Sequence, residues 1–172
     1  MISITFDDIN WKRNSIGIDR AEFLFMRGFN CCQSVFAAFA PRFGISEKDA
    51  LKLSCSLGGG IGRMREVCGT VSGISLLVSL CNGNTDPEDS DAKEENYRTV
   101  RMLADIFREK HKTIICRELL GIEKAENQAR PEARTAAYYN SRPCPHLVRD
   151  AAVIVEYYLD HYPDYCEKAA MK

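Results

Sequence analysis

Four cysteines stand where the surrounding residues predict that a helix begins: Cys31, Cys68, Cys116 and Cys144. The first turn of a helix carries unpaired N–H groups and the positive end of the helix dipole. A thiolate in that position is stabilised, and its pKa can fall from about 8.5 to roughly 3.5–7.5. Because the thiolate is both the nucleophile and the metal ligand, these positions predict either redox chemistry or metal binding.

The other four cysteines are expected to differ. Cys55 and Cys81 fall inside apolar helical stretches, which predicts that they are core residues. Cys166 lies near the end of the chain, and no role is predicted for it. Cys32 adjoins Cys31, and we expect Cys32 to point into the bundle while Cys31 faces the site.

The spacing of the cysteines leaves their chemistry open. Structural zinc sites usually contain close C-x2-C pairs, and ferredoxins contain dense cysteine runs, neither of which occurs here. The absence of C-x-x-C also argues against a thioredoxin-like motif. A four-thiolate metal or iron–sulfur site therefore requires ligands far apart in the chain to converge. Plain packing of small apolar thiols is the third alternative.

The sequence GGGIGRMREVCG is the strongest local break in the chain, because four glycines in five residues disfavour both helix and central strand. It follows no predicted strand, which argues against a dinucleotide-binding loop. We expect it to let the backbone approach the cysteines closely. Arg63 and Arg65 could hold Cys68 as thiolate or bind an anionic substrate, or could simply be solvated. Glu66 could carry a proton and His146 could be a ligand or base, although ordinary surface roles are as common for both.

Helical periodicity recurs along the chain, and no convincing period of two appears. Asn30 and Ser46 are predicted N-caps, and Asp91 with Glu94 is predicted to open a later helix. Helices are expected over 19–26, 31–43, 46–57, 70–80, from 91, over 116–120 and from 144, with broken helix over 122–139. The fold class predicted is all-α, an irregular helical bundle with a glycine-rich loop, formed as a single domain over residues 1–172.

Bulk composition excludes several classes of function. The chain has 172 residues, with 23 basic and 24 acidic side chains and a net charge of -1. This balance predicts no binding to nucleic acid. The most apolar stretch, 74–81, is too short for a membrane span of roughly 20 residues, so no membrane insertion is expected. The N-terminus does not resemble a signal peptide, which predicts a cytoplasmic protein with reduced cysteines.

The segments GFNCCQSV, GGGIGRMREVCGTVSG, IICRELLG and CPHLV together resemble the C_GCAxxG_C_C family of redox-active proteins, over about residues 20–160. The resemblance implies a small helical protein whose four characteristic cysteines are the same four that begin helices. It also implies that Gly69 and Gly73 are the signature glycines. With Arg63, these glycines are our candidates for contacts to a cofactor or substrate. Thr70 replaces the alanine of the signature, and Cys32 replaces a residue that is usually small.

Three functions are compatible with these patterns. The first is a thiol-based redox protein, which could be a thiol oxidoreductase, with Cys68 as the attacking thiolate and another of the four cysteines resolving the mixed disulfide. The second is a metal or iron–sulfur protein in which all four cysteines are ligands. The third is a structural or partner-binding helical domain, and its apolar stripes could also pair two copies as a homodimer. The substrate or redox partner, and whether any cofactor is present, are left open.

Overall fold

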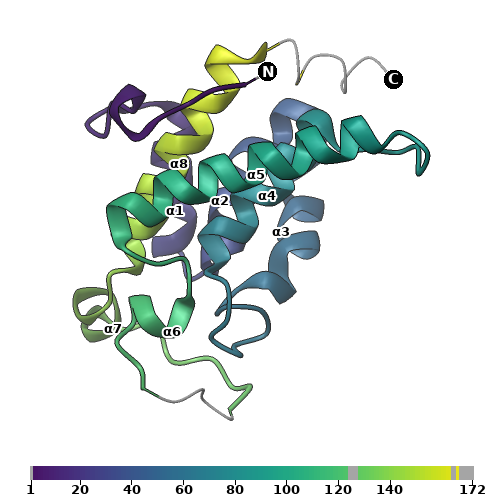
Figure 1. The fold of residues 1–172 in the computed structure, drawn as a ribbon. Helices are drawn as coiled ribbons and strands as arrows, with labels where there is room; N and C mark the ends of the chain where they lie inside the picture. The colour runs from purple at the N-terminus through teal and green to yellow at the C-terminus, as the bar shows by residue number, and fades with distance from the viewer. Residues whose placement is uncertain (1, 124–127, 164–165, 167–172) are drawn as a thin grey trace.

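The structure is a computed structural model that describes residues 2–123, 128–163 and 166. The fold is all-α, as predicted (Figure 1), and the only β pairing among the described residues is a bridge between Val67 and Ile115. Three short 3-10 helices accompany the α-helices, at Phe6–Asp8, Ala40–Phe43 and Cys55–Leu57. The α-helices are α1 (Ile16–Met26), α2 (Cys31–Phe39), α3 (Glu47–Ser54), α4 (Gly69–Asn82), α5 (Ser90–His111), α6 (Cys116–Leu119), α7 (Ala136–Ser141) and α8 (Cys144–His161).

Side-chain caps set the starts of several helices. The Asn30 side chain accepts a hydrogen bond from the Gln33 N–H at 3.0 Å, and the Ser46 side chain caps α3 in the same way. Both caps confirm the sequence prediction. The predicted start of α5 at Asp91 was wrong, because Asp89 is the N-cap and the helix begins one residue later. Asp89 and Asp91 can both serve as caps, and only the path of the preceding turn selects between them.

Helix α2 is the centre of the bundle, packing against α1, α3, α4 and α8. The core forms one contiguous cluster whose largest fully buried side chains include Phe25, Phe39, Phe107 and Tyr158. Helix α5 crosses the front of the molecule in Figure 1. The glycine-rich loop, α6 and α7 lie together at the lower end of the molecule in this view. This end carries the starts of α4, α6 and α8, so residues distant in sequence are brought together there.

The buried faces of the helices differ in width. Helix α8 contributes most of one side to the core cluster, including Leu147, Val148, Ala151, Ala152, Val155, Tyr158 and Leu159. On α5, Leu103 and Phe107 are buried, but Tyr97 is 61% exposed. Helix α3 has eight residues, of which only Ala50 and Ser54 are buried, and its Leu53 is 64% exposed.

The region predicted as broken helix over 122–139 is only partly described, because 124–127 lie outside the described residues. From 128 to 135 the chain forms no helix, and α7 then begins at Ala136, where the Thr135 side chain accepts a hydrogen bond from the Tyr138 N–H. This irregular segment reaches the lower end of the bundle, where it contributes to the site described below.

Two of the cysteines lie far from that end. The structure pairs Cys81, buried near the end of α4, with Cys166 as a disulfide, their Cα atoms 4.0 Å apart. Cys81 is a core residue as predicted, but Cys166 has a partner that the sequence did not indicate. Eighty-five residues separate the two, and no local pattern reports such a contact.

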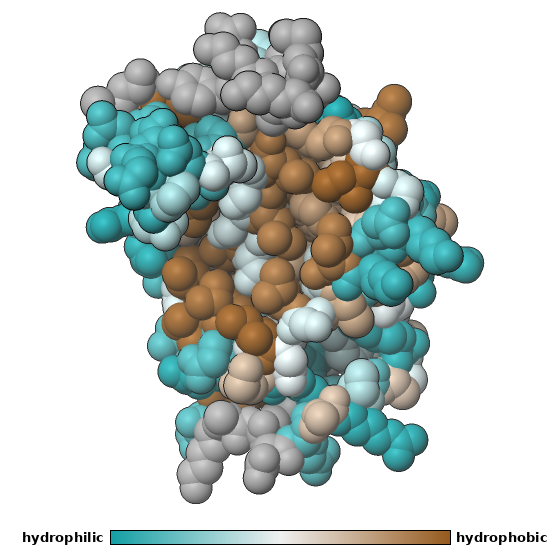
Figure 2. Space-filling view, turned by 90° about the vertical axis from the view of Figure 1, so that its right-hand side faces the viewer, coloured by the Kyte–Doolittle hydropathy of each residue, from teal (hydrophilic) through white to brown (hydrophobic). Residues whose placement is uncertain are grey.

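The surface of the bundle is not uniformly polar. Figure 2 shows a largely hydrophobic area between hydrophilic margins, on the side that lies to the right in Figure 1. Within the described part of the chain, no helix combines the length and the apolar character needed to cross a membrane. Formation of a homodimer stays a prediction.

Candidate functional site

The four helix-start cysteines line a single cavity of about 280 Å³. Cys31, Cys116 and Cys144 are the first residues of α2, α6 and α8, and Cys68 is the residue that precedes α4. The bundle therefore brings together thiols that are more than a hundred residues apart in sequence. Figure 1 shows the same end of the molecule, where these helices begin.

The glycine-rich loop supplies the close backbone approach that its composition predicted. Gly60 has φ +66°, and a Cβ atom added there would lie 2.6 Å from the Glu66 N and 2.8 Å from the Cys116 Cβ. Gly59 and Gly62 also have positive φ, and so do Arg63 and Arg65 at 69° and 63°. The loop is thus a left-handed coil that only glycine adopts without strain at its tightest point.

A short backbone pairing joins this loop to the start of α6. The Cys68 N–H donates to the Ile114 carbonyl at 2.8 Å, and the Cys116 N–H donates to the Glu66 carbonyl at 2.6 Å. These bonds flank the bridge between Val67 and Ile115. These hydrogen bonds hold Cys68 and Cys116 on two adjacent backbone segments that border the cavity.

The two signature glycines bring α4 close to α2. A Cβ on Gly69 would lie 3.0 Å from the Cys32 N and 3.2 Å from the Cys31 Cβ, and one on Gly73 would lie 2.9 Å from the Val35 Cβ. Gly69 also lines the cavity, whereas Gly73 packs in the helix interface away from it. Gly73 thus serves the packing of α4 on α2, and its candidate role in binding a cofactor stays a prediction.

The thiols of Cys31 and Cys144 are hydrogen-bonded to each other. This bond lowers the pKa of Cys144 to about 7, and the charges of Arg142 and Arg134 add to the effect, while burial opposes it. The same hydrogen bond, together with burial, raises the pKa of Cys31 well above its ordinary value. When the pair loses its first proton, the thiolate is therefore favoured on Cys144 and the remaining proton on Cys31.

The other two helix-start thiols, those of Cys68 and Cys116, are held neutral. Burial raises the pKa of Cys68 to about 12, outweighing the hydrogen bond between its Sγ and the Thr70 Oγ1 at 3.1 Å. Burial also raises the pKa of Cys116, against the opposing hydrogen bond from Arg65. The raised pKa of Cys68 does not favour its predicted role as the activated thiolate, which stays a prediction. A helix start favours the thiolate, but desolvation and the neighbouring thiols oppose it more strongly.

A group of arginines surrounds the cavity, and three of them contact one carboxylate. Glu132 Oε1 lies 3.3 Å from Arg63 Nη2 and 3.7 Å from Arg65 Nη2, and it also accepts a hydrogen bond from Arg142. Arg63 and Arg65 thus share the contact with Glu132, and Arg65 also donates a hydrogen bond to Cys116. A role of either arginine toward Cys68 stays a prediction.

Sequence reasoning missed the contribution of the segment before α8. Arg134 lies over the Tyr138 ring with its guanidinium carbon 4.5 Å from the ring centroid, and Arg142 lies 4.7 Å from the same centroid. Glu132 belongs to this segment too. The only available signal was the run of arginines and tyrosines that immediately precedes Cys144.

The remaining cysteines also differ from expectation. Cys32 is fully buried, as predicted, and burial raises its pKa to about 12. Cys55 is exposed and lines the cavity, so its predicted place in the core was wrong. It follows the last residue of the short helix α3, where the chain turns outward into the glycine-rich loop.

The weaker candidates named from the sequence lie outside the cavity. Glu66 is exposed and forms an ion pair with Arg117 at 3.0 Å, and His146 is exposed on α8. His111 contacts Asp150 at 3.1 Å, a partner that sequence did not suggest. None of these side chains lines the thiol cavity.

Metal binding by the cysteines gains no support from the geometry. Across residues 2–123, 128–163 and 166, no group of three or more His, Cys, Asp or Glu side chains is placed to hold a metal ion. The four helix-start thiols in the cavity instead form one hydrogen-bonded pair, Cys31 and Cys144, and two buried thiols with raised pKa, Cys68 and Cys116.

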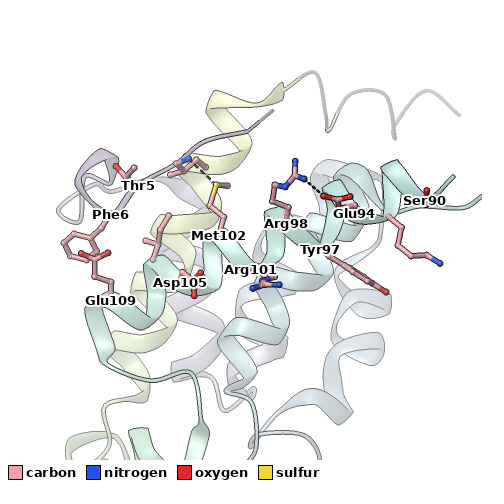
Figure 3. A pocket seen from close by; sticks show the side chains of 13 residues that line it. Thr5, Phe6, Ser90, Glu94, Tyr97, Arg98, Arg101, Met102, Asp105 and Glu109 are labelled. Atoms are coloured by element: carbon pink, nitrogen blue, oxygen red, sulfur yellow. Dashed lines mark hydrogen bonds and ion pairs between the residues drawn. The ribbon is translucent and has the colours of Figure 1, made fainter.

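A second and larger hollow, of about 880 Å³, has no sulfur nucleophile. It lies along α5 and the N-terminal segment, where the Ile4 N–H contacts the Met102 Sδ at 3.2 Å (Figure 3). The labelled residues in Figure 3 are mainly charged side chains of α5, such as Glu94 and Arg98, which pair with each other. The cysteines named as site residues from the sequence therefore lie in the smaller cavity and not in this hollow.

Comparison with known families agrees with this location. A family model described as "Putative redox-active protein (C_GCAxxG_C_C)" matches residues 29–158, a range that contains all four cavity cysteines. No curated protein and no solved structure is significantly similar to the chain. The match covers well over half of the sequence, so the chain belongs to the C_GCAxxG_C_C family of redox-active proteins.

Proposed function

We propose that the protein carries out thiol–disulfide exchange, with Cys144 as the attacking thiolate and Cys31 as the resolving thiol. The observation that carries this proposal is the hydrogen bond between the two thiols, which lowers the pKa of Cys144, whereas the pKa values of Cys31, Cys68 and Cys116 are raised. The attacking thiol reacts best when its pKa is near the ambient pH.

The exchange has two steps that balance. The Cys144 thiolate attacks a disulfide R–S–S–R′, forming a mixed disulfide with RS and releasing R′S⁻, which takes a proton from solvent. The Cys31 thiol then loses its proton and attacks the Cys144 sulfur, forming the Cys31–Cys144 disulfide and releasing RSH. The substrate gains two electrons, and the protein loses two. An external dithiol reductant returns the pair to the reduced state.

The residues around the pair support the assignment of Cys144 as the attacking thiolate. The charges of Arg142 and Arg134 favour the thiolate form of Cys144 over the thiol. The raised pKa of Cys68 and Cys116 keeps both protonated at neutral pH, so that they do not compete as nucleophiles.

The test uses a Cys55→Ser background, which removes the exposed thiol at the cavity. The reduced protein is treated at mildly acidic pH with a limiting amount of iodoacetamide, and the modified peptides are quantified by mass spectrometry. Cys144 is expected to be modified first. In a Cys31→Ser variant, a small disulfide should remain trapped as a mixed disulfide on Cys144.

Two outcomes would overturn the proposal. One is preferential modification of Cys68 or Cys116 at acidic pH. The other is oxidation that yields no Cys31–Cys144 disulfide in the protein that retains both thiols. A Cys32→Ser variant is the matched control for Cys31→Ser, because Cys32 is adjacent and buried but is not hydrogen-bonded to Cys144.

A further inference from the structure

The cavity that contains the thiols has an excess of positive charge. Four arginines line it, namely Arg63, Arg65, Arg134 and Arg142, against one carboxylate, Glu132, among the lining residues that the structure describes. The chain as a whole carries a net charge of -1, so this concentration of cations is local. A cationic cavity with low-dielectric walls attracts anions.

Glu132 meets three of these arginines through a single oxygen. Arg63, Arg65 and Arg142 all approach Oε1, although a carboxylate can engage a guanidinium through both of its oxygens. The Glu132 side chain is 41% exposed, and it belongs to a stretch without regular secondary structure. Its carboxylate is therefore held where a carboxylate from solution could replace it.

Arg134 provides a second and independent observation. Its Nη1 is buried and has no hydrogen-bond partner, while its Nη2 donates to the Phe29 carbonyl at 3.3 Å. The guanidinium is enclosed by the rings of Tyr138 and Phe25, at 4.5 and 4.9 Å from their centroids. A buried donor without an acceptor is unfavourable, and an anionic ligand in the cavity would supply the acceptor.

We propose that this arginine group is a subsite for a carboxylate, and that the substrate of the thiol pair is a small organic disulfide bearing a carboxylate group. The subsite rests on the thiol–disulfide exchange proposed above. The substrate carboxylate takes the place of Glu132 on the arginines while its disulfide meets Cys144. A volume of about 280 Å³ admits a small molecule and excludes a folded protein domain.

Three disulfides that differ mainly in charge test the proposal: dithiodipropionate (anionic), dithiodiethanol (neutral) and cystamine (cationic). The rate at which each oxidises the reduced Cys55→Ser protein is divided by its rate with free 2-mercaptoethanol, a thiol without a charged substituent, which removes differences in intrinsic reactivity. The corrected rate should be about tenfold higher for the anionic than for the neutral disulfide, as expected for one charge-assisted interaction. Added salt should reduce this ratio, and cystamine should react most slowly.

Substitutions in the subsite should change the ratio of the corrected rates, anionic over neutral disulfide, in opposite directions. Arg63→Gln should lower it, because a cation is lost, and Arg63→Lys should retain most of it. Glu132→Gln should raise it, because the competing carboxylate is lost. Arg98→Gln is the control, since Arg98 pairs with Glu94 on α5 and does not line the cavity. Thermal melts of each variant establish that it is folded.

The outcomes separate the two proposals. If all three disulfides oxidise the Cys31–Cys144 pair with equal corrected rates, or if neither Arg63→Gln nor Glu132→Gln changes the ratio, the carboxylate subsite is wrong and thiol exchange stands. If none of the three forms a Cys31–Cys144 disulfide, thiol exchange itself is wrong, and the carboxylate-bearing disulfide is no longer its substrate.

Discussion

At the scale of single residues, the reactivity of a cysteine here depends on its partner more than on its place in a helix. Cys31 and Cys144 both begin long helices, yet the pKa is raised for one and lowered for the other. The difference arises because one proton between two close sulfur atoms stabilises a single thiolate, and the arginine charges select Cys144.

Replacing Cys31 by alanine should raise the pKa of Cys144, because the first cause of its lowered value is removed. Iodoacetamide modification of Cys144 at pH about 7 should slow by about tenfold, while the rates at strongly alkaline pH should converge with those of the unmodified sequence. Cys31→Ser, which keeps a hydroxyl donor, should show a smaller change. An unaltered pH profile in Cys31→Ala would contradict this account.

The raised pKa of Cys68 should make the free energy of unfolding fall at alkaline pH. Its folded-state pKa is about 12, compared with an ordinary value of 9.0, so its stabilising effect is complete below about 9 and is lost as the pH rises toward 12. Between these pH values the free energy of unfolding should fall less steeply with pH in Cys68→Ala than in the unmodified sequence. The two slopes should differ by up to about 1.4 kcal/mol per pH unit. Urea titrations at several pH values measure this slope. Cys55→Ala, at an exposed thiol, should leave it unchanged.

At the scale of elements, the glycine-rich loop positions Cys116 by permitting contact between two backbone segments. Gly60 is the loop glycine that lies against Cys116. Gly60 lies against Glu66, Arg65 and Cys116, whereas a Cβ on Gly62 would meet nothing within 4 Å. The two positions share a positive φ, at +66° and +54°, and so form a matched pair.

Gly60→Ala should therefore cost more stability than Gly62→Ala. Gly62→Ala should lower the free energy of unfolding by about 1 kcal/mol, from the left-handed backbone alone. Gly60→Ala should lower it by at least about 3 kcal/mol and should expose Cys116 to alkylation, because backbone atoms must move apart. Chemical denaturation gives both values. Equal effects of the two substitutions would show that Gly60 has no special contact.

The elements also show which features a sequence can predict. The caps at Asn30 and Ser46 are local, because donor and acceptor are three residues apart, and both were predicted. The pairing of Cys31 with Cys144 and the approach of Arg134 to Phe29 depend on how separate helices pack. The positions of the four cysteines were therefore predictable, and their ionisation was not.

At the scale of the whole molecule, the sulfur atoms form two separate groups. One lines the cavity, and the other is the Cys81–Cys166 pair, which joins α4 to the C-terminal part of the chain. Helical periodicity predicted the fold class correctly, because it recurs along most of the chain and no period of two competes with it. It could not predict this cross-link, since neither cysteine has a neighbouring motif.

Removing the cross-link should destabilise the protein only under oxidising conditions. Cys166→Ala should lower the free energy of unfolding by about 2–4 kcal/mol in the absence of reductant, because a long loop is released in the unfolded chain. With dithiothreitol present, the variant and the unmodified sequence should unfold together. A non-reducing peptide map that shows no Cys81–Cys166 species would contradict the pairing.

The meeting of the α2 and α8 starts has a consequence for protein turnover. Helix α2 contacts most of the other helices, and α8 supplies much of the core, so a covalent bond between Cys31 and Cys144 would fasten two ends of the same packed interior. The oxidised form would then melt at a higher temperature than the reduced form. Proteases that act on transiently opened chains would consequently degrade the reduced protein faster, and cellular abundance would follow the supply of oxidant.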